Sequence, residues 1–220
     1  MASTVVEKRT KRRPQERAEL TRKRLLEVAV RLFSEKAYDA VTLREIEVTA
    51  GVQRNLASYH FGDKKALWRA AASYLFDELQ LFSEPRLELL KDLAPRDRIA
   101  LMLRTLVRFS SKRPELHRLM LQEGKADSWR LRWLTQNYVK PAKAELKAMV
   151  QDDLDLSDRE FVFWYYLYIG AGATMYTMAP EVKDVHGIDV SEPGVIEEHA
   201  NMLVEFLLPL ARSIKEKSAA

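Results

Sequence analysis

The sequence contains no cysteine. Disulfide bonds, catalysis by a thiolate and cysteine-ligated zinc sites are therefore excluded. Glycine and proline are also scarce, with seven and eight residues among 220, which favours long helices joined by few turns. No run approaches the roughly 18 apolar residues that suggest a membrane span. The N-terminus is polar and basic and lacks the apolar core of a secretory signal, so we expect a cytoplasmic protein.

Motifs typical of enzymes and metal sites are missing as well. We find no glycine loop that would bind phosphates and no nucleophile motif. None of the four histidines has a second histidine or a carboxylate at a convincing metal-ligand spacing. His186 and Asp189 fall in a predicted loop, where we do not expect a metal. We therefore expect no enzymatic activity and no bound metal or cofactor.

The segment 42–65 has the pattern of two short helices separated by a tight turn. Thr42 is a favourable N-cap, and Glu45, three residues on, completes a capping-box pattern. The apolar stripe of this first helix comprises Leu43, Ile46 and Ala50. Gly51 follows directly, where a sharp turn requires a positive φ. A second helix is predicted over about 53–61 and ends at Gly62.

Two short helices joined in this way can set the second one into a DNA major groove. Arg54 can bond guanine as a fork, and Gln53 or Asn55 can bond adenine. Tyr59 and His60 are residue types that hold phosphate oxygens and fix the register. A small helical corner with solvated polar residues is the plainer alternative. The candidate DNA-binding residues are Thr42, Arg44, Gln53, Arg54, Asn55, Ser58, Tyr59, His60 and Lys64.

The charge is concentrated at one end of the chain. Up to Ala70 there are 16 Lys and Arg against 9 Asp and Glu, a balance of +7, whereas the remainder holds 20 against 23, a balance of −3. This asymmetry predicts a polyanionic partner for the N-terminal part alone. Residues 1–17 carry six of the cations without any apolar period. We expect a flexible arm there, which either solubilises the protein or contacts DNA beside the second helix; the neighbouring helix-turn-helix favours DNA contact.

These residues carry a family resemblance: the segment from Leu25 to Ala70 resembles the DNA-binding domain of the TetR family of transcriptional repressors. The matching positions are Leu32-Phe33, Tyr38, Thr42, Ile46, Ala50-Gly51-Val52, Tyr59-His60-Phe61 and Lys64. Three positions depart from the family pattern. Ala37 stands where the family usually has Gly, Glu47 where it usually has a small Ala, and 56–58 reads Leu-Ala-Ser, which leaves open which of these side chains touches DNA.

The resemblance implies an all-α protein with an N-terminal three-helix helix-turn-helix domain and a larger C-terminal helical domain for ligand binding and dimerisation. We expect the arm over 1–17, the DNA-binding domain over 18–63 and the regulatory domain over 64–220. Apolar periodicity and caps predict helices over about 18–36, 64–84, 95–112, 114–124, 128–150, 157–179 and 194–215. Residues 181–193 are expected to form a polar loop, and the helix after Ser157 is apolar all round, so it should be buried on most sides.

In the family, the last two helices pair with their copies to form a four-helix bundle, and the C-terminal domain encloses a small-molecule pocket. The resemblance thus implies a homodimer that binds a palindromic operator and is released by a small apolar or aromatic effector. The candidate effector-binding residues are Leu103, Leu106, Phe109, Met120, Trp129, Trp133, Trp164, Tyr168 and Met175. Ordinary core packing is the alternative role for each of them. A constitutive DNA-binding or protein-interaction module without a pocket is the alternative function, and repressor against activator stays open.

Overall fold

The computed structural model describes the backbone of residues 2–90 and 92–218, and side chains over 15–86, 92–151 and 154–208. Every regular element in these residues is helical, as the sequence predicts. Contacts divide the chain into two units, one ending at Leu75 and one beginning at Phe76. The division falls inside α4, twelve residues beyond the boundary expected at 63. The first part of α4 belongs to the N-terminal unit because Leu67, Trp68 and Leu75 are buried there.

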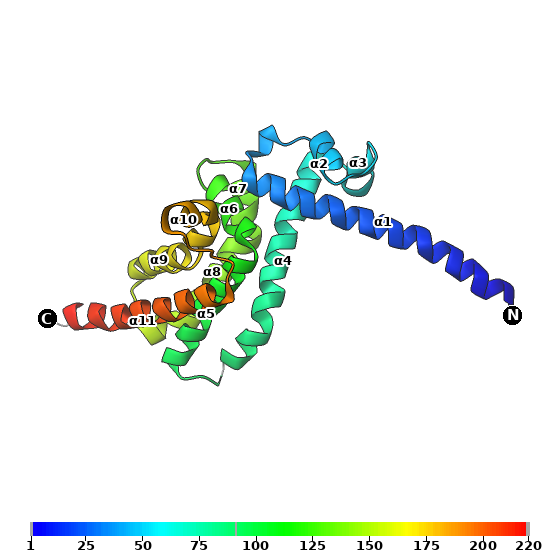
Figure 1. Cartoon of the computed structure of the whole chain (residues 1–220). Helices are drawn as coiled ribbons and strands as arrows, with labels where there is room; N and C mark the ends of the chain where they lie inside the picture. The colour runs from blue at the N-terminus through cyan, green and yellow to red at the C-terminus, as the bar shows by residue number, and fades with distance from the viewer. Residues whose placement is uncertain (1, 91, 219–220) are drawn as a thin grey trace. The chain divides into compact units, whose positions relative to one another are not determined.

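The N-terminal unit consists of α1 (Ala2–Glu35), the 3-10 turn η1 (Tyr38–Ala40), α2 (Leu43–Thr49), α3 (Leu56–Phe61) and the beginning of α4 (Lys64–Leu90) (Figure 1). Helices α1, α2 and α3 pack against one another around a core that includes Leu25, Phe33 and Ile46. The Tyr38 ring stacks on Phe33, with ring centroids 5.8 Å apart. The loop after α1 is thereby attached to the core.

Helix α1 begins at Ala2 and not near Ala18, so the expected flexible arm lies within the helix. Apolar periodicity could not indicate this extension, because a sequence rich in Lys, Arg, Glu and Gln can form a helix without an apolar repeat. The side chains of Lys8, Arg9, Lys11, Arg12 and Arg13 lie outside the described residues. Their contact with DNA stays a prediction.

The second unit contains the end of α4 and a bundle of further helices. These are α5 (Pro95–Lys112), α6 (Pro114–Glu123), α7 (Trp129–Leu134), the π-helical segment η2 (Thr135–Val139), α8 (Lys140–Leu154), α9 (Asp158–Thr177), α10 (Ala179–His186) and α11 (Pro193–Ser218) (Figure 1). Helix α5 packs against α9 and α11. Gly172 permits the close approach of α5 and α9, because a Cβ at that position would collide with the Leu106 side chain.

Three prolines lie within or at the start of helices whose bounds differ from those predicted. Pro85 does not end α4, which continues to Leu90. Helix α10 has Pro180 in its first turn and extends to His186, so it occupies the first part of the segment 181–193 that was predicted as a polar loop. A proline in the first helical turn loses nothing, since its missing N–H would have no partner there. Pro141 lies in the segment 128–150 predicted as a single helix; the structure divides this segment, with η2 ending at Val139 and Pro141 in the first turn of α8.

One face of α9 is exposed, contrary to the expectation that this helix is buried on most sides. Phe161 and Trp164 lie in the core, whereas Phe163, Tyr166 and Leu167 are 61%, 70% and 48% exposed. Two large side chains of α11, Met202 and Phe206, are exposed as well. Helices α9 and α11 contact each other, and both carry large apolar side chains that this single chain does not cover.

Candidate nucleic-acid interface and effector residues

The first helix of the helix-turn-helix has the predicted cap. The Thr42 hydroxyl accepts a hydrogen bond from the Glu45 N–H at 3.0 Å. The Lys36 ammonium donates to the Glu45 carboxylate at 2.6 Å, and this hydrogen bond holds the pKa of Glu45 below its usual range. The cap fixes where α2 begins, and Gly51, with φ of 63°, makes the predicted turn after it.

The second helix begins three residues later than predicted, at Leu56. Gln53, Arg54 and Asn55 therefore lie in the turn before α3 and not on it. Asn55 has φ of 69°, a left-handed conformation that ends the turn and that asparagine tolerates better than most residues. Periodicity could not locate this start, since a short polar helix end has no apolar repeat to mark it.

Glu47 supplies the cap that Asn55 does not. Its side chain is only 4% exposed, and its carboxylate accepts a hydrogen bond from the Ala57 N–H at 3.1 Å. The Asn55 side chain makes no capping bond. A buried carboxylate from α2 thus satisfies a donor at the start of α3 and favours its positive dipole end. The departure from the family's small residue at 47 has this role, which the sequence alone did not reveal.

Most of the predicted DNA-binding residues lie on the surface of the N-terminal unit. Tyr59 is 78% exposed and its ring meets His60 edge-on, with centroids 5.1 Å apart. Within the described side chains, Arg54 has no ion-pair partner, and Arg44 lies 3.9 Å from the Glu47 carboxylate with 59% of its side chain exposed. The other exposed members are Thr42, Gln53, Asn55 and Ser58.

The two remaining residues, His60 and Lys64, are partly buried. The Lys64 ammonium lies 4.3 Å from the centroid of the Tyr38 ring and 3.4 Å from the carbonyl oxygen of Asp39. These contacts orient a cation at the start of α4 without neutralising it. Exposed polar side chains and cations on crossed short helices are suited to phosphate contacts and base contacts.

Residues 25–71 match the family model described as bacterial regulatory proteins, tetR family. This part of the chain, which holds the helix-turn-helix, is thus similar to the tetR family. It is 40% identical over 57 residues to the HTH-type transcriptional regulator AcrR of Shigella flexneri, a match that covers 26% of each chain. It is 34% identical over 56 residues to the biofilm operon icaADBC HTH-type negative transcriptional regulator IcaR of Staphylococcus aureus, covering 26% of this chain and 30% of the relative. The aligned part thus spans less than a third of either relative.

The fold resembles that of a TetR-family transcriptional regulator from Streptomyces coelicolor, with a TM-score of 0.53 over 90% of this chain and 85% of the other. The two sequences are 19% identical, so the likeness concerns the fold alone. It confirms the predicted fold class, an N-terminal helix-turn-helix followed by a larger helical domain. In the described part of the chain, no helix is long and apolar enough to cross a membrane.

The predicted effector residues are dispersed through the second unit. Leu103 and Phe109 are fully buried, and Leu106 and Trp164 nearly so; Leu106 fills the close approach of α5 to α9. Trp164 stacks on Tyr168, with centroids 5.2 Å apart, and burial raises the pKa of the Tyr168 phenol. The partly buried members are Met120, Trp129, Trp133, Tyr168 and Met175.

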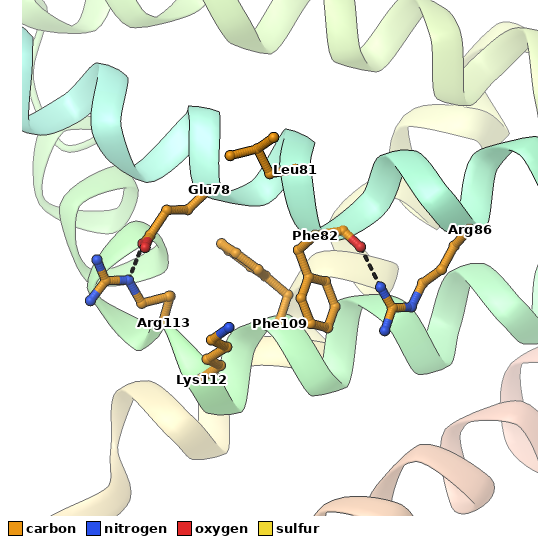
Figure 2. A pocket seen from close by; sticks show the side chains of 7 residues that line it. All are labelled: Glu78, Leu81, Phe82, Arg86, Phe109, Lys112 and Arg113. Carbon is orange, nitrogen blue, oxygen red and sulfur yellow. Dashed lines mark hydrogen bonds and ion pairs between the residues drawn. The ribbon is translucent and has the colours of Figure 1, made fainter.

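A pocket of about 360 Å³ lies between α4 and the end of α5, and Figure 2 shows its lining. Phe109 is the one predicted effector residue among its walls; the other eight of the predicted set do not line it. Its lining residues are Glu78, Leu81, Phe82, Arg86, Phe109, Lys112 and Arg113. Sequence reasoning missed six of these because the pocket joins two helices that are separated in the chain and rich in charge.

Proposed function

We propose that this protein is a DNA-binding transcriptional regulator of the TetR type that acts as a homodimer, represses from a palindromic operator and is released by a small molecule. The observation that carries the proposal is the exposed set of side chains around α3, above all Arg54 and Tyr59, within the segment that matches the family model. Repression, in preference to activation, is supported by the similarity to IcaR, a negative transcriptional regulator.

Dimerisation is supported by the uncovered side chains on α9 and α11. Phe163, Tyr166 and Phe206 are more than 60% exposed, and large aromatic side chains are enriched at protein interfaces. A second copy that packs the same two helices across a two-fold axis would cover them. Such a dimer presents two copies of α3, and half-sites about 34–36 Å apart, one turn of DNA, would suit it.

Release by a ligand requires that the ligand bind the non-operator state more tightly. A tenfold loss of operator affinity corresponds to about 1.4 kcal/mol of differential binding. The alternative, a constitutive module whose second unit binds no ligand, is opposed by the pocket of about 360 Å³, which lies at the lower end of the range of about 300–1,000 Å³ for small-molecule sites.

Selection from a random duplex library with the purified protein tests the proposal. We expect enrichment of an inverted repeat whose half-sites are one helical turn apart, and footprinting on the selected duplex should protect both half-sites. Arg54→Ala should lose the enriched base preference, whereas Lys125→Ala, which removes an exposed cation from the second unit, should retain it. Enrichment of no duplex, or of a single unrepeated site, would contradict the proposed dimeric regulator.

A further inference from the structure

We propose that the pocket between α4 and α5 binds a small molecule that combines a flat or short apolar body with a negative charge, such as an aromatic carboxylate. The inference rests on the proposed ligand response and makes it more specific: the sequence indicates an apolar or aromatic effector, and the pocket adds an anionic group. It concerns residues of the second unit alone.

The apolar part of the pocket is formed by two phenyl rings from different helices. Phe82 on α4 and Phe109 on α5 lie with ring centroids 5.6 Å apart and planes inclined by 54°. Phe109 is fully buried, whereas Leu81, the residue before Phe82 on α4, is 68% exposed. A ligand that covered Leu81 and the accessible part of Phe82 would remove apolar surface from water, which favours binding.

Cations flank the Phe82 ring. The Arg86 guanidinium lies 4.1 Å and the Lys112 ammonium 5.8 Å from its centroid, and in Figure 2 the two groups lie on either side of it. Arg86 also donates a hydrogen bond to the carbonyl oxygen of Phe82. The Lys112 side chain is exposed, and within the described side chains it forms no ion pair.

The acidic side chain that lines the pocket forms an ion pair with a neighbouring arginine. Glu78 forms an ion pair with Arg113, and both side chains are largely buried. The seven lining residues therefore comprise three cations and one carboxylate, and the pair leaves Arg86 and Lys112 in excess. Cations beside an apolar wall favour an anion, because the site is partly shielded from water and charge-assisted hydrogen bonds are the strongest available.

A matched pair of probes tests the inference: 2-naphthoate, and 2-naphthamide, which has the same ring system without the charge. Isothermal titration calorimetry of the full chain, without DNA, should show that naphthoate binds more tightly and that its affinity, unlike that of the amide, falls as salt is added. Lys112→Met should weaken naphthoate binding about fivefold and leave the amide nearly unchanged. Phe82→Ala should weaken both.

Lys125→Met is the control, since it removes an exposed cation of the same unit that does not line the pocket. Thermal melting of each variant establishes that it is folded. Equal affinity for the two probes, equal effects of the two lysine substitutions, or no binding of naphthoate at millimolar concentration would overturn the inference. Because DNA is absent, these outcomes are separate from those of duplex selection: the pocket inference can fail while DNA binding holds, and the reverse.

Discussion

At the residue scale, the hydrogen bond from the Ala57 N–H to the Glu47 carboxylate links α2 to the start of α3. Glu47→Ala leaves this donor without a side-chain acceptor, because Asn55 makes no capping bond. We expect a loss of about 1–2 kcal/mol of stability, measured by urea unfolding, and weaker binding to the selected duplex.

Glu47→Gln is the matched variant because it keeps an oxygen that can accept the same hydrogen bond. It should recover most of the stability and of the DNA affinity. If Glu47→Ala and Glu47→Gln were equally destabilised, or if neither differed from the parent protein, the capping role of this side chain would be wrong.

A second prediction at this scale concerns His117 on α6. Burial lowers its pKa from 6.5 to about 4, and its Nδ1 is buried without a hydrogen-bond partner in the described part of the chain. The unfolded chain therefore takes up a proton near pH 6.5 and the folded chain only near pH 4, so stability falls as the pH drops through this window. The loss at pH 5 relative to pH 7 is about 2 kcal/mol.

Urea unfolding at pH 7 and pH 5 measures this loss, and His117→Leu should reduce it by about 2 kcal/mol. Burial also lowers the pKa of His199, whose Nδ1 lies 3.0 Å from the Tyr176 hydroxyl. This second histidine also makes the protein less stable in acid, so the variant must be compared with its parent. An unchanged pH dependence in His117→Leu would show that this histidine titrates normally.

At the element scale, helix ends with a local chemical signal could be predicted from the sequence. Thr42 and Ser157 accept the expected capping bonds, and Pro95 and Pro114 begin the helices predicted there. The other ends depend on context. Pro180 reads equally as a stop and as a first-turn residue, and the turn at Asn55 is set by packing of α3 onto α2 and α1, which no local pattern records.

Of the two candidate sites, one has a local sequence signal and the other depends on tertiary packing. The predicted DNA-binding residues are close together in the sequence, so a motif could indicate them, although it placed Arg54 on the second helix instead of in the turn before it. The pocket brings Phe82 together with Phe109 from another helix. Its lining is set by which faces of α4 and α5 meet, and apolar side chains such as Leu103 and Trp164, predicted for a pocket, are used in core packing.

The exposed faces of α9 and α11 lead to a prediction about assembly. Tyr166→Glu places a charge on the uncovered face of α9, where burial against a second copy would leave it unpaired at a cost of several kcal/mol. We expect the dissociation constant of the dimer to rise by about two orders of magnitude or more, as measured by analytical ultracentrifugation.

Leu121→Glu is the control, since Leu121 is an exposed apolar residue on α6, at 60%, and should leave the dimer intact. A parent protein that sediments as a monomer at micromolar concentration would contradict the assembly, as would equal behaviour of the two variants.

At the scale of the whole molecule, the features that support the two proposed activities lie in different units. The N-terminal part has the excess of positive charge and the exposed helix-turn-helix; the second unit has the pocket and the uncovered helices. The proposed ligand acts only through a difference in its affinity for two states of the dimer. Operator affinity measured with and without saturating naphthoate therefore gives the coupling free energy directly.

The most direct test of the account is the salt dependence of binding to the selected duplex, measured by fluorescence anisotropy for the parent protein, Arg54→Ala and Lys64→Ala. We predict that the logarithm of the binding constant falls linearly with the logarithm of salt concentration. Lys64→Ala should weaken all duplexes alike and reduce the slope by about one, whereas Arg54→Ala should cost about 1–3 kcal/mol and relax base preference. An affinity that is independent of salt, or unchanged in both variants, would contradict DNA binding through this face.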